Sequence, residues 1–146
     1  MNRTPLDLAQ ILLVEDNEGD IILTKEAFQE CKIKSEINIA RNGQEAIDFL
    51  FKTGKYKNVK TPDLILLDIN LPILSGLEVL QKVKEDTLLG KIPVIVLTTS
   101  ANKEDIETAY AHHCNSYVQK PIDMGEFLNA VVKIEEFWLS LSTLPK

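Results

Sequence analysis

The chain has 146 residues, which suits one domain with a substantial core and leaves little room for a second. Its 22 acidic and 16 basic side chains give a net charge of −6, which argues against broad electrostatic binding to nucleic acid or anionic lipid. No apolar run approaches the roughly 20 residues that span a bilayer, no signal peptide is visible, and two distant cysteines indicate reduced thiols, so we expect a cytoplasmic protein without a membrane partner.

Short apolar runs alternate with helical patterns of apolar residues along the chain. Strands are predicted at residues 11–14, 37–39, 64–67, 93–97 and 117–118. Helices are predicted at about residues 19–31, 46–51, 77–83 and 103–110, and from about residue 123. Strands that are apolar throughout and separated by helices are typical of a parallel sheet covered on both faces.

This alternation predicts an α/β fold, a flavodoxin-like doubly wound (βα)5 domain whose five parallel strands run in the order 2-1-3-4-5. A barrel is less suitable, because it needs about eight strand–helix units. We expect a single domain over residues 1–146, with its core at about 9–135 and a C-terminal helix extension and tail at 136–146.

Carboxylates follow two of the predicted strands. Glu15 and Asp16 come directly after the first strand, and Asp68 ends the apolar run 64–67. Ligands of open parallel sheets bind at the carboxyl ends of the strands, so these three acids should lie together. Close carboxylates repel one another unless a cation is present, and oxygen ligands favour a hard cation such as Mg²⁺. The alternative for Glu15 and Asp16 is that they only cap the following helix.

A hydroxyl and an ammonium follow two other strands. Thr98 follows the fourth strand and Lys120 the fifth, so both should face the acids. Beside an acidic metal site they could bind the oxygens of a phosphoryl group, and Asp68 could attack phosphorus to form an aspartyl phosphate. Taken singly, Thr98 could be an ordinary strand terminus and Lys120 a solvated loop charge. The sequence contains neither a G-x-x-x-x-G-K-[ST] nor a G-x-G-x-x-G phosphate-binding loop.

Four motifs together resemble the receiver domain of bacterial two-component response regulators over about residues 9–135. They are ILLVEDN, LILLDINLPILSG, VIVLTTS and SYVQKP. The resemblance implies a phosphorylatable switch and not an enzyme with a separate substrate. In such a switch Asp68 accepts phosphoryl from a phosphohistidine of a sensor histidine kinase. The resemblance also implies that Asp16, Asp68 and the main-chain carbonyl of Asn70 hold Mg²⁺, with Glu15 acting through water.

The resemblance implies further roles around the phosphoryl group. Thr98 and Lys120 would bind its oxygens, and the bond between Lys120 and Pro121 would be cis. When Thr98 moves toward the phosphoryl group, the Tyr117 ring would turn inward and change the surface of the fourth helix, fifth strand and fifth helix. Tyr117 could equally be an ordinary aromatic strand residue.

Apolar side chains crowd the C-terminal tail, where Phe137, Trp138 and Leu141 exceed what one helix face can bury. The tail either folds back on its own domain or forms a partner surface, which aromatic anchors favour. About ten residues follow the receiver core, so we expect output through protein contact and not through a DNA-binding or enzymatic domain. The tail and the polar insert at 54–61 resemble small response regulators that partner cyanobacterial phytochromes and form homodimers. This finer resemblance implies a phytochrome-type kinase and a homodimer.

Two other classes of protein fit parts of the pattern. Haloacid-dehalogenase-type phosphatases also use a strand-end Asp nucleophile with Mg²⁺, but they need a second acid two residues later, where this chain has Asn70. An unphosphorylated receiver-like interaction module would be expected to lack one of the acids or the lysine, and none of them is missing here.

Overall fold

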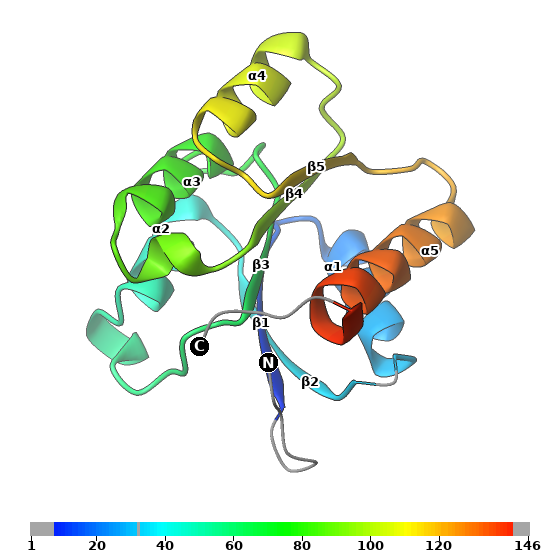
Figure 1. The fold of residues 1–146 in the computed structure, drawn as a ribbon, viewed down its shortest axis with the longest axis horizontal. Coiled ribbons are helices and arrows are strands. Elements are labelled where there is room, and N and C mark those ends of the chain that lie inside the picture. Colours follow the sequence, from blue (N-terminus) through cyan, green and yellow to red (C-terminus); the bar gives the residue numbers. More distant parts are fainter. Residues whose placement is uncertain (1–7, 32, 142–146) are drawn as a thin grey trace.

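Five strands and five α-helices alternate along residues 8–31 and 33–141, the part of the chain that the computed structural model describes (Figure 1). The strands are β1 (Ala9–Val14), β2 (Ser35–Ala40), β3 (Leu64–Leu67), β4 (Val94–Thr98) and β5 (Ser116–Gln119). The α-helices are α1 (Glu18–Gln29), α2 (Gly43–Leu50), α3 (Gly76–Glu85), α4 (Lys103–Ala111) and α5 (Met124–Glu135). The same residues include two short 3-10 helices, η1 (Gly54–Tyr56) and η2 (Leu89–Lys91), and the π-helix η3 (Glu136–Leu141), which follows α5 directly.

The strands form one parallel sheet in the order β2-β1-β3-β4-β5, which confirms the predicted flavodoxin-like fold. The register places Val14 beside both Ala40 and Leu67, so β1, β2 and β3 end at the same level. At the other side of the sheet, Thr98 at the end of β4 lies beside Gln119 at the end of β5. All five strands therefore present their carboxyl ends at one edge of the sheet.

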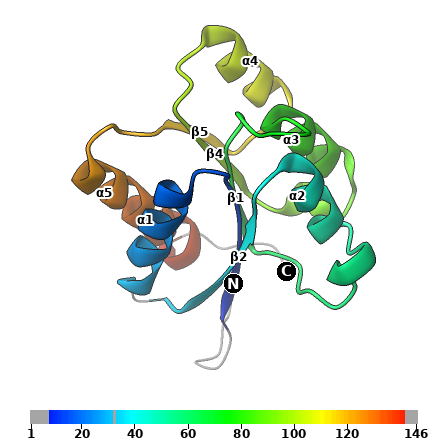
Figure 2. The same ribbon diagram turned by 180° about the vertical axis from the view of Figure 1, so that it is seen from behind.

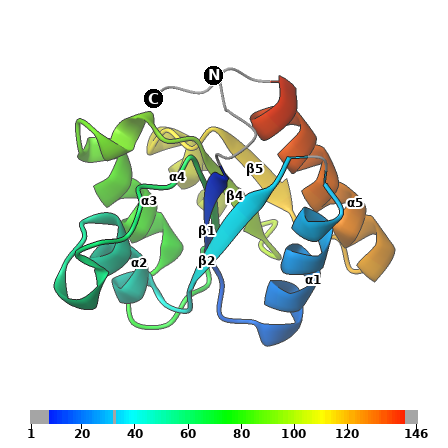
Figure 3. The ribbon, with the colours of Figure 1, turned by 90° about the horizontal axis from the view of Figure 1, so that it is seen from below.

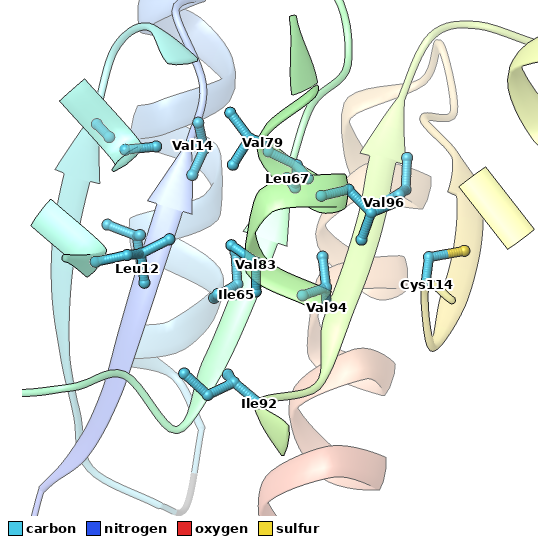
Figure 4. Packing of buried hydrophobic residues seen from close by; sticks show 14 of the residues in the cluster. Leu12, Val14, Ile65, Leu67, Val79, Val83, Ile92, Val94, Val96 and Cys114 are labelled. Carbon is cyan, nitrogen blue, oxygen red and sulfur yellow. The ribbon is translucent and has the colours of Figure 1, made fainter. Parts of the chain in front are cut away.

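Helices cover both faces of the sheet, as the view from below shows (Figure 3). α2, α3 and α4 lie on one face, and α1 packs beside α5 on the other (Figure 2). Alternate residues of β1 supply the two faces: Leu12 and Val14 enter the core under α2 and α3, and Ile11 and Leu13 enter the core under α1 and α5. Figure 4 shows the first of these cores from close by. The strands are apolar throughout because both of their faces are buried.

Each α-helix begins directly after a side chain that caps its first turn. The capping oxygen accepts a backbone N–H from two or three residues further along the chain, and the capping residues are Asn17, Asn42, Ser75, Asn102 and Asp123. Such a cap typically stabilises a helix by about 1 kcal/mol. The caps fix where each helix starts relative to the strand before it, and they hold the loops at the carboxyl edge in place.

Two glycines allow the loops that follow β2 and β3 to lie close to their neighbours. A Cβ atom on Gly43 would lie 1.9 Å from the carbonyl oxygen of Leu74, and one on Gly76 would lie 2.1 Å from the carbonyl oxygen of Asp68. Neither position leaves room for a side chain, because the obstructing atoms belong to the backbone. The start of α3 is therefore held directly against the main chain of Asp68.

The connection between α2 and β3 touches the core at two points. Tyr56 and Val59 pack against the core cluster under α2 and α3, and the Tyr56 ring centroid lies 5.4 Å from that of Phe49. The other residues from 52 to 60 are exposed, in agreement with the polar loop that the sequence predicts. This connection leads into the amino end of β3, at the opposite edge of the sheet from the strand ends described above.

No helix within residues 8–31 and 33–141 is both long enough and apolar enough to cross a membrane.

Candidate functional site

Three acids meet at the carboxyl ends of β1 and β3, where the sequence predicts them. β1 pairs with β3 so that Val14 lies opposite Leu67, which brings the next residues, Glu15 and Asp68, side by side. The Asp68 N–H donates to the Val14 carbonyl oxygen at 3.0 Å. Carboxylate oxygens of Glu15, Asp16 and Asp68 all lie within 4.8 Å of one another.

This acidic group fits a hard divalent cation. All three donor atoms are carboxylate oxygens, which suit Mg²⁺ and Mn²⁺. Glu15 and Asp68 are buried and Asp16 is exposed, so a cation could be held from inside the protein while keeping a side open to water. Asn70 lies beside the group, since its N–H donates to Asp68 Oδ1 at 3.2 Å. Its carbonyl oxygen as a metal ligand stays a prediction.

A buried lysine connects the acids. The Lys120 ammonium lies 2.5 Å from Glu15 Oε1, 2.9 Å from Asp20 Oδ2 and 3.2 Å from Asp68 Oδ2. An ammonium has three N–H donors, so these three carboxylates account for all of them. The Lys120 side chain is 4% exposed, which removes its charge almost completely from water. Carboxylates on all sides compensate for that loss of hydration.

Burial and charge act in opposite directions on these groups. Burial raises the pKa of the Glu15 carboxyl to about 7, although the hydrogen bond and charge of Lys120 pull it down. Burial by itself would lower the pKa of Lys120, but the hydrogen bonds to Glu15 and Asp20 and the charge of Asp68 outweigh it, so this pKa is raised. The lysine is therefore positively charged at neutral pH.

Thr98 is connected to the candidate switch residue through Ser100. The buried Thr98 hydroxyl oxygen accepts the Ser100 N–H at 3.4 Å, which leaves its own proton available for another acceptor. The Tyr117 hydroxyl donates to the Ser100 carbonyl oxygen at 2.8 Å, and its half-buried ring packs against the core under α2 and α3. The Ser100 hydroxyl donates to Asp105 in α4 at 2.6 Å. The hydrogen bonds therefore run from Thr98 to both β5 and α4.

The expected cis bond before Pro121 is wrong. Residues 8–31 and 33–141 contain no cis peptide bond, so the bond between Lys120 and Pro121 is trans. With this trans bond, the Lys120 N–H donates to the Thr98 carbonyl oxygen at 2.7 Å and the ammonium still contacts the acids. Trans is also the intrinsically favoured form of an X–Pro bond, by about 0.5–1 kcal/mol.

The site contains a fourth acid, Asp20, which the pattern of strand ends does not predict. Asp20 lies in the first turn of α1, and its carboxylate contacts Lys120 but is not part of the three-acid group. One signal was available: Asp20 is four residues after Asp16, and the helix that contains it follows β1 directly. An acid in the first turn of a helix is usually explained by its favourable interaction with the helix dipole. That explanation does not predict a contact with Lys120, which is 100 positions away in the sequence.

The C-terminal residues singled out in the sequence divide between surface and core. Phe137 is 52% exposed, while Trp138 is half-buried against the core under α1 and α5. Their ring centroids lie 5.2 Å apart in an edge-to-face arrangement. Leu141 ends η3, and its side chain lies outside the described part of the structure. Part of the tail therefore folds back on the domain, while one aromatic ring remains at the surface.

Comparisons with known proteins agree with this geometry. Residues 11–132 match the family described as response regulator receiver domain. The response regulator Rcp1 of Synechocystis sp. (strain ATCC 27184 / PCC 6803 / Kazusa) is 44% identical over 135 residues, which cover 92% of this chain and 92% of that protein.

Two solved structures share the fold along almost their whole length. The phosphorylated cyanobacterial phytochrome response regulator RcpA superposes with a TM-score of 0.94 at 45% identity, covering 96% of this chain and 100% of that one. The Mn²⁺-bound form of Rcp1 gives a TM-score of 0.92 at 43% identity, covering 94% of this chain and 99% of that one.

Proposed function

This chain belongs to the response regulator receiver domain family, and from that premise we propose that Asp68 accepts a phosphoryl group from a histidine of a sensor kinase. The single observation that carries the proposal is the buried Lys120 ammonium held 3.2 Å from the Asp68 carboxylate among further acids. A cation in this position suits a phosphoryl group on Asp68. The acidic group would hold Mg²⁺ through Asp16, Asp68 and the main-chain carbonyl of Asn70, with Glu15 acting through water.

The proposed transfer uses the side chains in separate roles. An Asp68 carboxylate oxygen attacks phosphorus, the bond from phosphorus to the donor nitrogen breaks, and the histidine ring keeps the electron pair. The Lys120 donor that faces Asp68 and the free Thr98 proton then bind phosphoryl oxygens. Bound Mg²⁺ would supply positive charge that neutralises the phosphoryl oxygens. The protein acts only on its own carboxylate, and later hydrolysis returns Asp68 to its free form.

We propose that the signal reaches the surface through Ser100. When the Thr98 hydroxyl moves toward a phosphoryl oxygen, its hydrogen bond with the Ser100 N–H would shift Ser100. Ser100 is hydrogen-bonded to both Tyr117 and Asp105, so the shift would reach β5 and α4. α4 is suited to move, because Ala109 is its only buried residue. Output then depends on a changed surface of α4, β5 and α5, which contacts other proteins and not nucleic acid.

The kinase partner is proposed from the relatives and from an exposed apolar rim. RcpA is named as a cyanobacterial phytochrome response regulator, so we propose a phytochrome-type sensor histidine kinase for this chain as well. Ile22 in α1, Ile122 after β5 and Met124 at the start of α5 are 50%, 103% and 64% exposed. They lie close in sequence to Asp20 and Lys120, and such apolar side chains next to a charged site suit a protein donor.

The proposed function predicts Mg²⁺-dependent phosphorylation of the wild-type protein. Incubation with acetyl phosphate and Mg²⁺ should add one phosphoryl group, about 80 Da, and excess EDTA should prevent it because the acids then repel the donor. Intact mass spectrometry measures the gain. If no gain occurs, binding of beryllofluoride distinguishes a short-lived phosphoryl group from the alternative function, an unphosphorylated interaction module.

We propose that the receiver core spans about residues 9–135 and that the extension at 136–141 contributes to a homodimer interface formed with α4, β5 and α5. The exposed Phe137 ring would be its aromatic anchor, supported by Trp138. Residues 142–146, the rest of the predicted tail, lie outside the described residues. Cys31 and Cys114 are free thiols, which suits the cytoplasmic location that we propose.

The dimer interface predicts a selective effect of Phe137→Glu. Placing a charge on the anchor should weaken dimerisation at least about tenfold, because a desolvated charge opposes association. Sedimentation at tens of micromolar, with and without beryllofluoride, measures the effect. Phe51→Glu is the matched control, since Phe51 is 41% exposed directly after α2, which packs on β2 at the opposite edge of the sheet from β5. A wild-type protein that stays monomeric in both states would refute the interface.

A further inference from the structure

One carboxylate of the site has no role in the function proposed so far. Asp20 Oδ2 lies 2.9 Å from the Lys120 ammonium, yet Asp20 is not among the three acids grouped to hold a cation. Its side chain is 25% exposed, whereas those of Glu15 and Asp68 are 4% and 9% exposed. Asp20 therefore lies on the solvent side of the lysine.

The helix holds Asp20 firmly in this place. Its N–H donates to the capping oxygen of Asn17 at 2.9 Å, and its carbonyl oxygen accepts the Thr24 hydroxyl at 2.7 Å. Asp20 and Asp68 contact the same nitrogen, so their nearest oxygens are at most about 6 Å apart, a distance at which two charges interact strongly outside bulk water. Any phosphoryl group that reaches Asp68 comes close to the Asp20 charge.

The charge balance of the site makes this proximity unfavourable for a free donor. Glu15, Asp20 and Asp68 contact one ammonium, and Asp16 lies with Glu15 and Asp68. When all four carboxylates are ionised, a bound divalent cation still leaves the cluster with one formal negative charge. Without Asp20 the charge with the cation would be zero. Small phosphoryl donors are anions with few other groups that could offset the repulsion. A docked protein donor would offset it through apolar contacts with the exposed side chains of Ile22, Ile122 and Met124.

We propose that Asp20 is a specificity-determining residue that weakens the binding of free anionic phosphoryl donors and so reserves Asp68 for a donor docked as a protein. The inference rests on the proposed function of Asp68 as phosphoryl acceptor. Asp20 does not react in this scheme. It affects how well the donor binds, because it is a fixed negative charge beside the path of the phosphoryl group.

The test compares Asp20→Asn with the wild-type protein at saturating Mg²⁺. The amide keeps an oxygen that accepts a hydrogen bond from Lys120, so the substitution removes the charge but keeps the contact. With acetyl phosphate near neutral pH, we expect the apparent second-order rate constant of phosphorylation to rise about three- to tenfold. The rise should come from a lower half-saturating concentration, with little change in the maximal rate.

Two further measurements separate a charge effect from a structural one. Phosphoramidate, which carries less negative charge than acetyl phosphate near neutral pH, should gain less from the substitution. The gain with acetyl phosphate should shrink in about 0.5 M salt, because screening weakens the repulsion. Asp20→Glu keeps the charge and should retain the wild-type preference between the two donors.

Glu18→Gln is the matched control. Glu18 lies in the same turn of α1, but it pairs with Arg41 and has no contact with Lys120. Equal gains in Glu18→Gln and Asp20→Asn would overturn the inference in favour of a general charge effect. The inference would also be overturned if the wild type takes up phosphoryl from acetyl phosphate and Asp20→Asn takes it up no faster. Failure of both proteins to take up phosphoryl would instead refute the proposed function, and this inference with it.

Discussion

Asp68→Asn should abolish phosphoryl uptake and leave the folded structure intact. An amide has no carboxylate oxygen to attack phosphorus, yet its oxygen can still accept the Asn70 N–H that now reaches Asp68. The substitution also removes one of four neighbouring negative charges, so thermal stability should stay the same or rise. Asp68 lies beyond the end of β3, so the substitution should not alter the packing of the four buried residues of this strand.

The measurement is intact mass after incubation with acetyl phosphate and Mg²⁺, combined with a thermal unfolding curve. The gain of about 80 Da seen in the wild type should be absent from Asp68→Asn and from Asp68→Ala. Asp48→Asn is the matched control, because Asp48 is a carboxylate in α2 away from the strand ends and should leave uptake unchanged. Undiminished uptake in a folded Asp68 variant would assign the phosphoryl group to another residue.

Lys120→Met should destabilise the protein strongly in the absence of divalent cations. The substitution leaves Glu15 and Asp68 buried without their cation, and breaking a buried ion pair from one side typically costs about 3–5 kcal/mol. Because the pKa of Glu15 is already raised, this carboxyl can take up a proton and relieve part of the loss. We therefore expect the lower end of that range at neutral pH. Phosphoryl uptake should also fall strongly, since no ammonium binds the phosphoryl oxygens.

Urea unfolding in EDTA and in Mg²⁺ measures this effect. Mg²⁺ should stabilise Lys120→Met more than the wild type, because in the variant the added cation is the only positive charge among the acids. Lys103→Met is the control: Lys103 is 89% exposed and pairs with Glu107 at 3.8 Å, so its loss should hardly change the unfolding midpoint. A Lys120→Met protein as stable in EDTA as the wild type would show that the lysine is not needed to balance the acids.

The sequence predicts the sheet and most of the site because the same pattern encodes both. Apolar runs identify the strands, and the residue after each run must lie at the carboxyl edge, so Glu15, Asp68 and Lys120 could be brought together without a structure. The spacing of Asp20 from Asp16 suggests the same edge of the sheet, but its contact with Lys120 depends on how α1 lies across the sheet and not on any strand end. Such contacts are set by how the helix packs on the sheet in the tertiary structure. A local sequence pattern does not specify this packing.

Two other features also lay beyond the sequence. The bond before Pro121 is trans, although the resemblance implies cis, and no local pattern distinguishes two isomers of such similar energy. The hydrogen bond from Tyr117 to Ser100 joins residues on β5 and on the loop after β4, and only the tertiary structure sets the distance between them. The switch role of Tyr117 stays a prediction, and the hydrogen bond to Ser100 names the contact that would change during switching.

The connection between α2 and β3 has a consequence for engineering this protein. Tyr56 and Val59 anchor it, while Lys57 and Asn58 between them are exposed. Exposed loop tips of this kind tolerate inserted sequence best. A fluorescent reporter or a sensory module placed between Lys57 and Asn58 would leave both anchors in place. It would also lie at the amino end of β3, so the phosphoryl chemistry at the carboxyl end would remain accessible to a kinase.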